Sequence, residues 1–354
     1  MKPKILTILG TRPEIIRLSR ILPKLDHWCD HRLLHTGQNY DPNLNDIFFS
    51  QLRLRNPDQV LHSRGTLAQQ LAETFVGVEQ YLEQFRPHAV VILGDTNSGL
   101  SAVICERLGY PVYHMEAGNR CWDLAVPEER NRRIIDHACT MNMPYTELSR
   151  QNLLREGMPT DRIVVTGNPI REVINHYASD IQYSTVLDQL DLVPGQYIVA
   201  TAHRAENVDD PQRLHSIMRI LNTVSERMPV VFSCHPRTRQ RLTTDLSPQV
   251  RVLDPMGFFD WARLERDSRL ALTDSGTVQE EMCLFHKPTI TIRNTTERPE
   301  TVACGSNLVA GLDHDHVIHC VEQALHMQDW LVPQEYLQTN VSDVVVNQLL
   351  SHRR

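Results

Sequence analysis

The stretch KILTILGTRPEIIRL, residues 4–18, decides the fold class. It opens with a mostly apolar run that has the length of a buried strand and ends at Gly10. Gly10 permits a tight turn, and Pro13 suits the first turn of a helix. A buried strand that leads directly into a helix is the repeating unit of a parallel α/β sheet. We therefore expect the chain to open with the first strand of such a sheet.

The same alternation runs along most of the chain and restarts once. Helical patterns, such as the one over residues 66–85, separate short apolar runs that we interpret as buried strands. The predicted strands are residues 4–9, 32–37, 89–94, 111–115 and 162–167 in the first half, and 197–202, 229–234, 270–274, 288–292 and 307–311 in the second.

Strands that alternate with helices predict parallel sheets covered on both faces. The restart near Gly167 predicts two doubly wound, Rossmann-like domains, residues 1–167 and 168–354. The last helix of the second domain is placed so that it could pack back on the first. The expected fold is therefore α/β, with a cleft between two domains.

Composition and charge argue against several classes of protein. The 354 residues carry a formal net charge of −7, whereas nucleic-acid-binding domains usually present a basic face. No run of about 18 apolar residues occurs, so we expect no membrane span. The apolar N-terminus is short and lacks a small-residue cleavage site, and we interpret it as a strand, not a signal peptide. The eight cysteines form no CxxC pair, which argues against a zinc site or a disulfide framework and favours a reduced cytoplasm.

Ligands of doubly wound sheets bind beyond the carboxyl ends of the strands, so the residues that follow each predicted strand are the candidates. After the first strand, backbone N–H groups and the side chains of Arg12 and Arg17 would favour an anion. A capped helix with surface arginines fits the same pattern. After the strand 89–94, Asp95 is either a helix N-cap or a catalytic carboxylate.

The segment HMEAGNRCWDLAVPEERNRRIIDH, residues 114–137, concentrates charge directly after a buried strand. Glu116 follows that strand, Glu128 lies in the first turn of the next helix, and Arg132 follows one turn later. The loop between the two glutamates can fold one onto the other. Carboxylates brought together in a cleft raise one another's pKa, as general acid–base catalysis requires. A surface salt-bridge network is the alternative interpretation.

The second half offers the parts of a nucleotide site, again after predicted strands. Ser275, Gly276 and Thr277 combine hydroxyl groups with a helix N-terminus, which suits a diphosphate. Glu281, one turn on, has the reach to bind ribose hydroxyl groups. The other candidates are His203, His235 and Arg298 for the cleft, and Phe258 or Trp261 for stacking on a base. A capped helix, structural histidines and core aromatic residues are the alternatives.

Seven motifs together resemble those of one family. They are GTRPEIIRL, LGDTNS, EAGNRC, PEERNRR, TAHRAEN, TDSGTVQEE and TTERPE, and they occur in order between about residues 4 and 312. The chain resembles the non-hydrolysing UDP-N-acetylglucosamine 2-epimerases, which share the GT-B fold with many glycosyltransferases. The resemblance implies a UDP-sugar substrate, no cofactor, no metal at the reaction centre, and a homodimer.

The resemblance also implies a mechanism and its residues. A base removes the C2 proton, UDP leaves from C1, a 2-acetamidoglycal stays bound, and UDP adds back after C2 is protonated on the other face. Asp95, Glu116 and Glu128 match the catalytic carboxylates of the family, and His203 matches a histidine close to the diphosphate. The matching substrate ligands are Arg12, Arg132, Ser275, Gly276, Glu281 and Arg298.

Some positions depart from the pattern of the family. Arg17 replaces a lysine, Thr277 replaces a second glycine, and Asn119 and Cys121 change the EAG motif. The segment 35–49 differs where other members bind an activating second UDP-sugar. These variants resemble the branch that converts UDP-2-acetamido-2,6-dideoxy-L-talose to UDP-N-acetyl-L-fucosamine for capsule and O-antigen synthesis. The alternatives are UDP-GlcNAc or a diacetamido-uronate as the substrate, a GT-B glycosyltransferase, and a non-catalytic UDP-sugar sensor.

Overall fold

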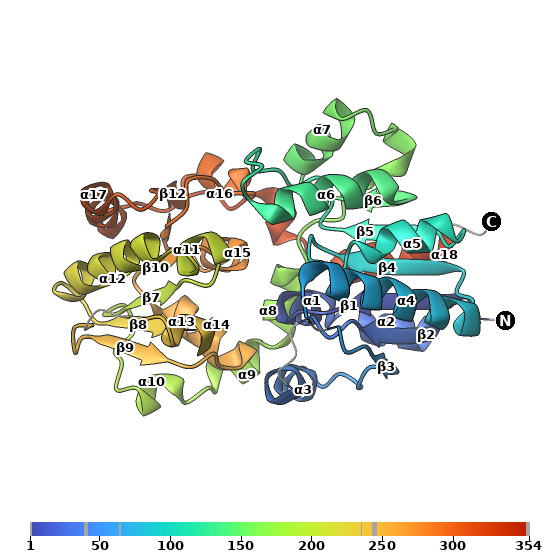
Figure 1. Cartoon of the computed structure of the whole chain (residues 1–354). Helices are drawn as coiled ribbons and strands as arrows, with labels where there is room; N and C mark the ends of the chain where they lie inside the picture. The colour runs from blue at the N-terminus through green and yellow to red at the C-terminus, as the bar shows by residue number, and fades with distance from the viewer. Residues whose placement is uncertain (1, 39–41, 64, 235, 243–245, 352–354) are drawn as a thin grey trace. The chain divides into compact units, whose positions relative to one another are not determined.

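The computed structural model describes residues 2–38, 42–63, 65–234, 236–242 and 246–351 (Figure 1). The chain forms two compact units. The first unit spans Met1–Asn175 and Glu335–Arg354, and the second spans His176–Gln334. The sequence analysis divided the chain slightly earlier, after residue 167. The C-terminal helix belongs to the first unit, where it packs on an early helix of the same unit.

The first unit contains a parallel sheet in the order β3-β2-β1-β4-β5-β6. Its strands are β1 (Lys4–Leu9), β2 (Asp30–His35), β3 (Gln59–Val60), β4 (Ala89–Leu93), β5 (Val112–Met115) and β6 (Met141–Met143). In the register of the sheet, β1 lies between β2 and β4, so Lys4 pairs with Asp30 and Ile5 pairs with Ala89. The chain therefore reverses its direction of winding between β1 and β4, which is where doubly wound sheets bind ligands.

Helices cover both faces of this sheet. The helical elements of this unit are α1 (Arg12–Leu18), α2 (Leu22–Trp28), α3 (Pro42–Gln51), α4 (Leu67–Phe85), α5 (Ser101–Arg107), α6 (Pro127–Ala138), α7 (Glu147–Arg155), η1 (Thr160–Arg162), α8 (Ile170–His176), η2 (Gln334–Leu337) and α18 (Val341–Ser351), of which α8 and η2 each extend one residue into the second unit. The helix predicted over 66–85 is confirmed as α4. Its N-cap Thr66 accepts the N–H of Gln69, and Val78 and Leu82 bury its apolar stripe against the sheet.

The second unit repeats the topology of the first. Its strand order, β12-β11-β10-β7-β8-β9, is the same winding read from the other edge. The strands are β7 (Ile198–Thr201), β8 (Val230–Ser233), β9 (Val250–Leu253), β10 (Ala271–Thr273), β11 (Thr289–Thr291) and β12 (Asn307–Val309). The equivalent switch point therefore lies between β7 and β10. The predicted fold class, with two Rossmann-like parallel sheets, is confirmed.

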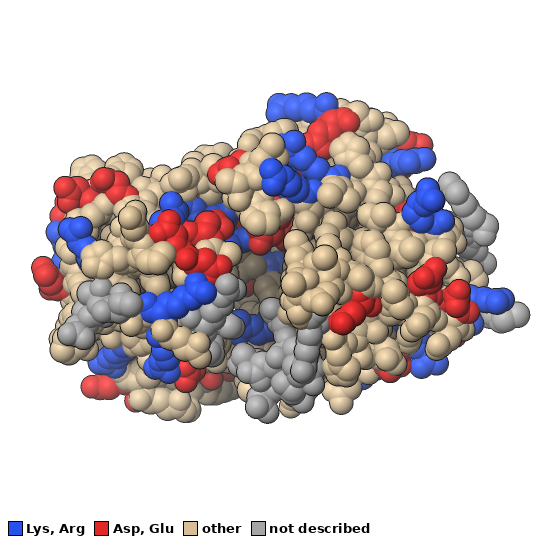
Figure 2. Space-filling model, in the orientation of Figure 1, with Lys and Arg blue, Asp and Glu red and all other residues tan. Residues whose placement is uncertain are grey.

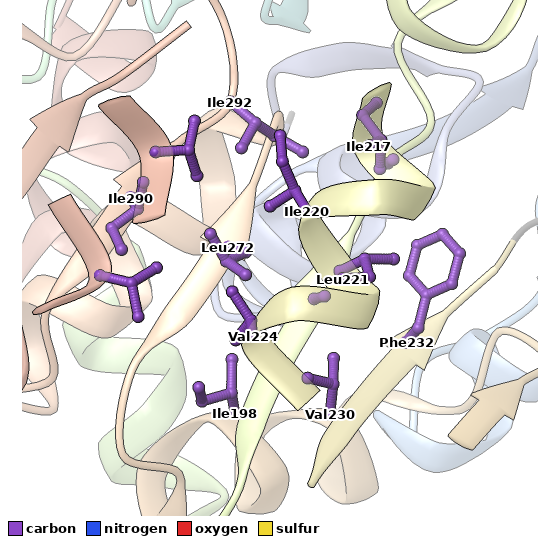
Figure 3. Close-up of a cluster of buried hydrophobic side chains, with 14 of the residues drawn as sticks. Ile198, Ile217, Ile220, Leu221, Val224, Val230, Phe232, Leu272, Ile290 and Ile292 are labelled. Atoms are coloured by element: carbon purple, nitrogen blue, oxygen red, sulfur yellow. The ribbon is translucent and has the colours of Figure 1, made fainter. Parts of the chain in front are cut away.

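In the second unit, successive side chains of the central strands pack alternately into two separate hydrophobic cores. Its helices are α9 (Ala178–Gln182), α10 (Val186–Gln189), α11 (Ala205–Val208), α12 (Pro211–Ser225), α13 (Pro236–Arg239), α14 (Phe258–Asp267), α15 (Gly276–Leu284), α16 (Pro299–Ala303) and α17 (His314–Leu325). Ile198 packs with Ile220 and Val224 of α12 on one face (Figure 3), and Val199 packs with Met282 of α15 on the other. Burial on both faces explains why these strands read as continuous apolar runs.

One predicted strand is wrong. Within residues 162–167, Ile163 alone forms an isolated bridge, to Asn142, and the sheet instead ends with β6. The segment still runs beside β6, since the N–H of Val164 bonds to Asn142 and that of Thr166 bonds to Pro144. The sequence did not reveal β6 because Asn142 interrupts its apolar pattern. Inside the fold, Nδ2 of Asn142 donates to the backbone carbonyl of Asp136.

The short edge strands β3 and β9 were also missed. Both residues of β3 are exposed, and most of β9 is only half-buried, so neither shows the apolar run that marks a central strand. None of the helices in the described part of the chain has the length and apolarity needed to cross a membrane. On the face shown in Figure 2, basic and acidic side chains are interspersed, in keeping with the modest net charge.

Candidate functional site

The loops after β1 and β4 meet at the switch point of the first unit. A Cβ atom at Gly10 would lie 2.2 Å from the hydroxyl oxygens of both Ser98 and Thr36, so a side chain here requires its neighbours to move. Those two hydroxyl groups also bond to each other at 2.6 Å. The glycine of the GTR motif is therefore required for close approach of three loops.

The buried carboxylate of Glu14 links the same two loops through hydrogen bonds. Its Oε2 accepts the N–H of Gly10 at 2.5 Å and that of Thr11 at 3.2 Å, and its Oε1 accepts the Thr96 hydroxyl at 2.8 Å. The side chain is buried, and burial raises the pKa of Glu14 to about 7 although the hydrogen bonds oppose the shift. The expectation that these N–H groups bind an anion is wrong for Gly10 and Thr11, because Glu14 occupies them.

Glu14 is not among the predicted site residues, although its sequence pattern carries a signal. A threonine followed three residues later by glutamate is the capping-box pattern, and Thr11 and Glu14 fit it. In this loop the glutamate caps the helix and also reaches the loop after β4. That second contact depends on the topology of the sheet and is not visible in the pattern.

Arg12 and Arg17 differ in their surroundings. The half-buried Arg12 places its guanidinium 5.9 Å from the centroid of the Phe48 ring. Arg17 is fully buried, and its Nε lies 4.0 Å from Oε2 of Glu116. The structure thus brings together Arg17 and one of the predicted catalytic carboxylates.

Asp95 lies beside Arg132, as part of a chain of charged groups. Nη1 of Arg132 donates to Oδ2 of Asp95, and Nη2 donates to Oε2 of Glu129 at 2.8 Å. The Cys121 N–H and thiol also approach Glu129, at 3.0 and 3.4 Å. Burial disfavours the ionised form of Glu129, but the Cys121 N–H and Arg132 outweigh it and lower its pKa. Asp95 is therefore held by an arginine that is itself fixed by a buried glutamate.

Glu116 occupies a sharp turn at the end of β5. Its φ of +66° is unusual for a residue with a side chain, and the backbone therefore holds local strain there. Asn119 donates a long hydrogen bond, 3.4 Å, to Oε1 of Glu116. Gly118 follows with φ +79°, and a Cβ at this position would lie 2.3 Å from the carbonyl oxygen of Ser149. The EAGN turn therefore aims a partly exposed carboxylate from a closely packed backbone.

A buried cluster of charged side chains is hydrogen-bonded to the backbone of this turn. Asp136 accepts the N–H of Gly118 at 3.1 Å and contacts Nδ1 of His114 at 2.9 Å and Nη2 of Arg120 at 2.7 Å. Burial raises the pKa of Asp136, but His114 and Arg120 outweigh it and the net shift is downward. Asp136 is not among the predicted site residues, because its spacing alone indicates only one more charge on a helix.

Glu128 lies in the first turn of α6, as predicted, and is half-buried. The next residue, Glu129, is fully buried and bonded to Arg132 and, at 3.2 Å, to Arg133. The two adjacent glutamates therefore have different surroundings. Glu129 stabilises the helix and its arginines, whereas Glu128 keeps a more accessible carboxylate.

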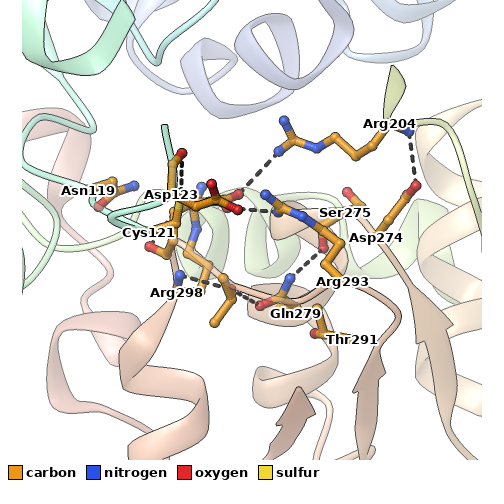
Figure 4. A network of polar contacts seen from close by, with 12 residues as sticks. Asn119, Cys121, Asp123, Arg204, Asp274, Ser275, Gln279, Thr291, Arg293 and Arg298 are labelled. Carbon is orange, nitrogen blue, oxygen red and sulfur yellow. Dashed lines mark hydrogen bonds and ion pairs between the residues drawn. The ribbon is translucent and has the colours of Figure 1, made fainter. Parts of the chain in front are cut away.

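In the second unit, Asp274 holds the loops at the switch point between β7 and β10. It accepts the backbone N–H groups of His203 and Arg204, both at 2.9 Å, and the side-chain amide of Asn207 at 3.1 Å. Figure 4 shows the contact with Arg204. Nδ1 of His203 lies 3.3 Å from Asp274, while the imidazole remains 47% exposed. His203 is thus oriented by a buried carboxylate and stays accessible to a ligand.

Three arginines converge on one buried glutamate beside the predicted nucleotide loop. Glu297 accepts from Arg204 at 3.2 Å and from Arg293 at 2.8 Å, and it lies 4.0 Å from Arg298. Figure 4 labels the three arginines. A Cβ at Gly276 would lie 2.5 Å from the Glu297 carboxylate, so the glycine makes room for it. Arg298 also pairs with the buried Glu280 at 2.5 Å. Arg293 also lies 3.4 Å from Glu206, so the result is a preformed arginine–glutamate cluster at the start of α15.

The remaining residues of the predicted nucleotide loop also lie at this helix start. The hydroxyl groups of Ser275 and Thr277 are 3.0 Å apart, and the Ser275 N–H donates to Thr273. Glu281 lies one turn further along α15 and is largely buried. These side chains therefore come from the same end of one helix, as the spacing of the motif predicted.

The aromatic candidates have different positions. Phe258 is a core residue, only 3% exposed, and packs against Tyr177 and Phe259, so the prediction that it stacks on a base is wrong for the conformation described. Trp261 is half-buried against the apolar cluster beneath α15. The candidate His235 lies outside the described residues.

The first unit also contains a cavity of about 600 Å³ that is unrelated to the predicted site. Its lining includes Lys4, Ala89 and Met141, which begin β1, β4 and β6. It therefore lies at the amino ends of the strands, opposite to the edge where the loops with Asp95 and Glu116 begin.

Comparisons with known proteins identify the family. Its profile, described as UDP-N-acetylglucosamine 2-epimerase, matches residues 24–350. A UDP-N-acetylglucosamine 2-epimerase of Methanocaldococcus jannaschii is 37% identical over 93% of this chain and 94% of its own length. A UDP-2,3-diacetamido-2,3-dideoxy-D-glucuronate 2-epimerase of Pseudomonas aeruginosa is 36% identical over 91% of this chain and 92% of its own.

A solved structure agrees with these relatives. The crystal structure of the Methanocaldococcus jannaschii UDP-GlcNAc 2-epimerase in complex with UDP-GlcNAc and UDP superposes with a TM-score of 0.94 at 36% identity, covering 99% of this chain and 100% of that one. The chain belongs to the UDP-N-acetylglucosamine 2-epimerase family and is an isomerase that acts as a UDP-sugar 2-epimerase.

Proposed function

We propose that the protein inverts C2 of a UDP-2-acetamido sugar by eliminating UDP and adding it back. Carboxylates of the first unit, Asp95, Glu116 and Glu128, are the acid–base groups. The second unit holds UDP through Ser275 and Thr277 and the arginines of the cluster beside them. This division of labour follows from the chemistry that each unit presents.

The observation that carries the proposal is the placement of Asp95 and Glu116 at the carboxyl edge of one sheet, each beside a buried arginine. The C2 proton of the sugar is weakly acidic, so its removal needs a positioned base and a leaving group that departs readily. Carboxylates that follow neighbouring strands supply the base. Arg17 and Arg132 fix their orientation, which is what proximity catalysis requires.

The proposed steps balance in atoms and charge. A carboxylate takes the C2 proton, the C2–H electron pair becomes the C1=C2 double bond, and the C1–O bond breaks as UDP leaves with its electrons. A second acid–base group then protonates C2 on the opposite face, and UDP adds back to C1. Cations that stabilise the departing diphosphate lower the barrier to the elimination. Arg12 and His203, both partly accessible, are the proposed contacts to the diphosphate.

For the substrate, we propose UDP-2-acetamido-2,6-dideoxy-L-talose, converted to UDP-N-acetyl-L-fucosamine for capsule or O-antigen synthesis. The support is the altered EAG motif: Asn119 bonds to the Glu116 carboxylate, and Cys121 contacts Arg132, the arginine that binds Asp95. The relatives named above favour UDP-GlcNAc and UDP-2,3-diacetamido-2,3-dideoxy-D-glucuronate as competing substrates.

A panel of UDP-2-acetamido sugars, including these three, tests the proposal. Each is incubated with the purified protein and followed by proton NMR for a new anomeric signal. We expect the L-talo sugar to be converted with the highest kcat/KM. A higher kcat/KM with UDP-GlcNAc or the uronate would replace the substrate assignment, and no epimerisation of any sugar would contradict the function. We further propose that the protein is a homodimer and that it is located in the cytoplasm. Mass photometry tests the oligomeric state, and cell fractionation tests the location.

A further inference from the structure

We propose that Glu14 is a positioning residue for Asp95, acting through the Thr96 hydroxyl. The inference rests on the proposed function, in which Asp95 is an acid–base group. Glu14 itself touches neither the sugar nor UDP in this scheme. It determines where the loop that carries Asp95 stands relative to the loop after β1.

The geometry of the Glu14 carboxyl group supports this role. One oxygen accepts two backbone N–H groups of the loop after β1, and the other accepts the hydroxyl of Thr96, the residue next to Asp95. The side chain is 2% exposed, so this link lies within the packed interior. An N-terminal cap of α1 would need only the first two bonds. The bond to Thr96 connects residues 82 positions apart and adds nothing to the helix.

The strength of the link depends on the charge of Glu14. An ionised carboxylate accepts the Thr96 hydroxyl in a charge-assisted bond, which is about twice as strong as a bond between neutral groups. A protonated carboxyl would donate to Thr96 instead, and the link would weaken. Because burial raises the pKa of Glu14 to about 7, both forms are populated near neutral pH.

Other titratable or charged groups lie on the neighbouring elements and must be separated from this effect. They are Arg12 and Arg17 on α1, His35 at the end of β2, Asp95 after β4, Glu116 after β5 and Arg132 on α6. Arg17 and Arg132 lie beside Glu116 and Asp95. Burial lowers the pKa of His35 to about 4, so its charge does not change between pH 6 and 8. The ratio of the wild-type kcat to the variant kcat at each pH cancels the effects that the remaining titratable groups have on both proteins.

The test compares the wild type with Glu14→Gln and with Thr96→Val and Thr96→Ser. Gln resembles protonated Glu14, since its oxygen can accept the two N–H groups and its amide can donate to Thr96. We expect the ratio of wild-type kcat to Glu14→Gln kcat to be near one at pH 6 and to rise about five-fold by pH 8, with KM changed less than about two-fold. Thr96→Val should lower kcat about ten-fold. Thr96→Ser keeps the hydroxyl and should restore most of that loss.

Hydrogen exchange of residues 94–100 without substrate provides a readout that does not depend on the reaction. Exchange in Thr96→Val should be several-fold faster than in the wild type, and Thr96→Ser should reverse the change. If the wild type epimerised no sugar, the proposed function would fail, and hydrogen exchange would still decide whether the link exists. A kcat ratio that is constant from pH 6 to 8, or unchanged exchange in Thr96→Val, would overturn the inference.

Discussion

The two switch points have the same topology, and at each a buried carboxylate, Glu14 or Asp274, accepts hydrogen bonds from the loops, but their arginines are placed differently. In the first unit, every described hydrogen-bond partner of Glu14 is a neutral donor. Arg17 and Arg132 instead lie beside the carboxylates of Glu116 and Asp95 at the carboxyl edge of the sheet. In the second unit, the arginines converge on the buried Glu297.

This difference matches two tasks. A site that moves protons needs accessible carboxylates in fixed positions, and the first unit places its arginines to fix them. A site that holds a diphosphate needs cations held close together before the ligand arrives. Glu297 offsets the mutual repulsion of Arg204, Arg293 and Arg298 in the absence of ligand. In the proposed function, the same fold therefore supports proton transfer at one switch point and anion binding at the other.

The largest effect should come from removing an acid–base group in the first unit. Glu116→Gln keeps the shape of the side chain but removes the base, and we expect kcat to fall by roughly 10²–10⁴. UDP affinity, measured by calorimetry, should change less than about two-fold. Glu83→Gln on the exposed face of α4 is the matched control and should behave like the wild type. Near-normal turnover in Glu116→Gln would remove the first unit from the acid–base chemistry.

The second prediction concerns the buried glutamate of the other switch point. Glu297→Gln leaves three arginines without their shared carboxylate, and breaking a buried ion pair in this way typically costs about 3–5 kcal/mol. We expect a lower melting temperature by calorimetry and weaker UDP binding, because the cations lose their arrangement. A variant as stable as the wild type would mean that Glu297 does not hold the cluster together.

Glu14→Gln should change stability in the opposite direction. A carboxyl group with a folded pKa of about 7, above its usual 4.5, binds more protons in the folded than in the unfolded state between these values. Its contribution to the free energy of unfolding is therefore present below pH 4.5 and lost as pH rises through 7. At pH 8 the variant should be more stable than the wild type by up to about 3 kcal/mol. Thermal melts at pH 5 and pH 8 check this, and equal stability at pH 8 would contradict the sign.

The smallest effect concerns a single hydroxyl group at the start of α15. If Ser275 contacts UDP, Ser275→Ala should weaken UDP binding about five-fold, the loss expected for one hydrogen bond, without changing the melting temperature. Isothermal titration with UDP measures the affinity. An unchanged dissociation constant would place the nucleotide elsewhere on the second unit.

The sequence predicted those features of the two switch points that depend on local sequence pattern. Apolar runs followed by glycine and helix starts identified the central strands and, with them, Asp95, Glu116, His203 and Ser275 as residues at strand ends. Edge strands such as β9 were missed because half-burial leaves no apolar run.

The supporting carboxylates could not be predicted in the same way. Glu14, Asp274 and Glu297 act by accepting hydrogen bonds from residues that are distant in the sequence, and which loops meet depends on strand order. Two interpretations of Phe258 stayed open for a related reason, since nothing in its spacing distinguishes a core ring from one that stacks on a base. Tertiary contacts decide the role of such side chains.

The most direct test of the central claim is the fate of the C2 hydrogen during turnover in D₂O. The proposed substrate is epimerised by the wild type, and the product is analysed by NMR and mass spectrometry. Removal of the C2 proton by a carboxylate of the first unit, with reprotonation from solvent-exchanged acid, predicts deuterium at C2 of the product. A product that keeps its original hydrogen at C2 would contradict the account.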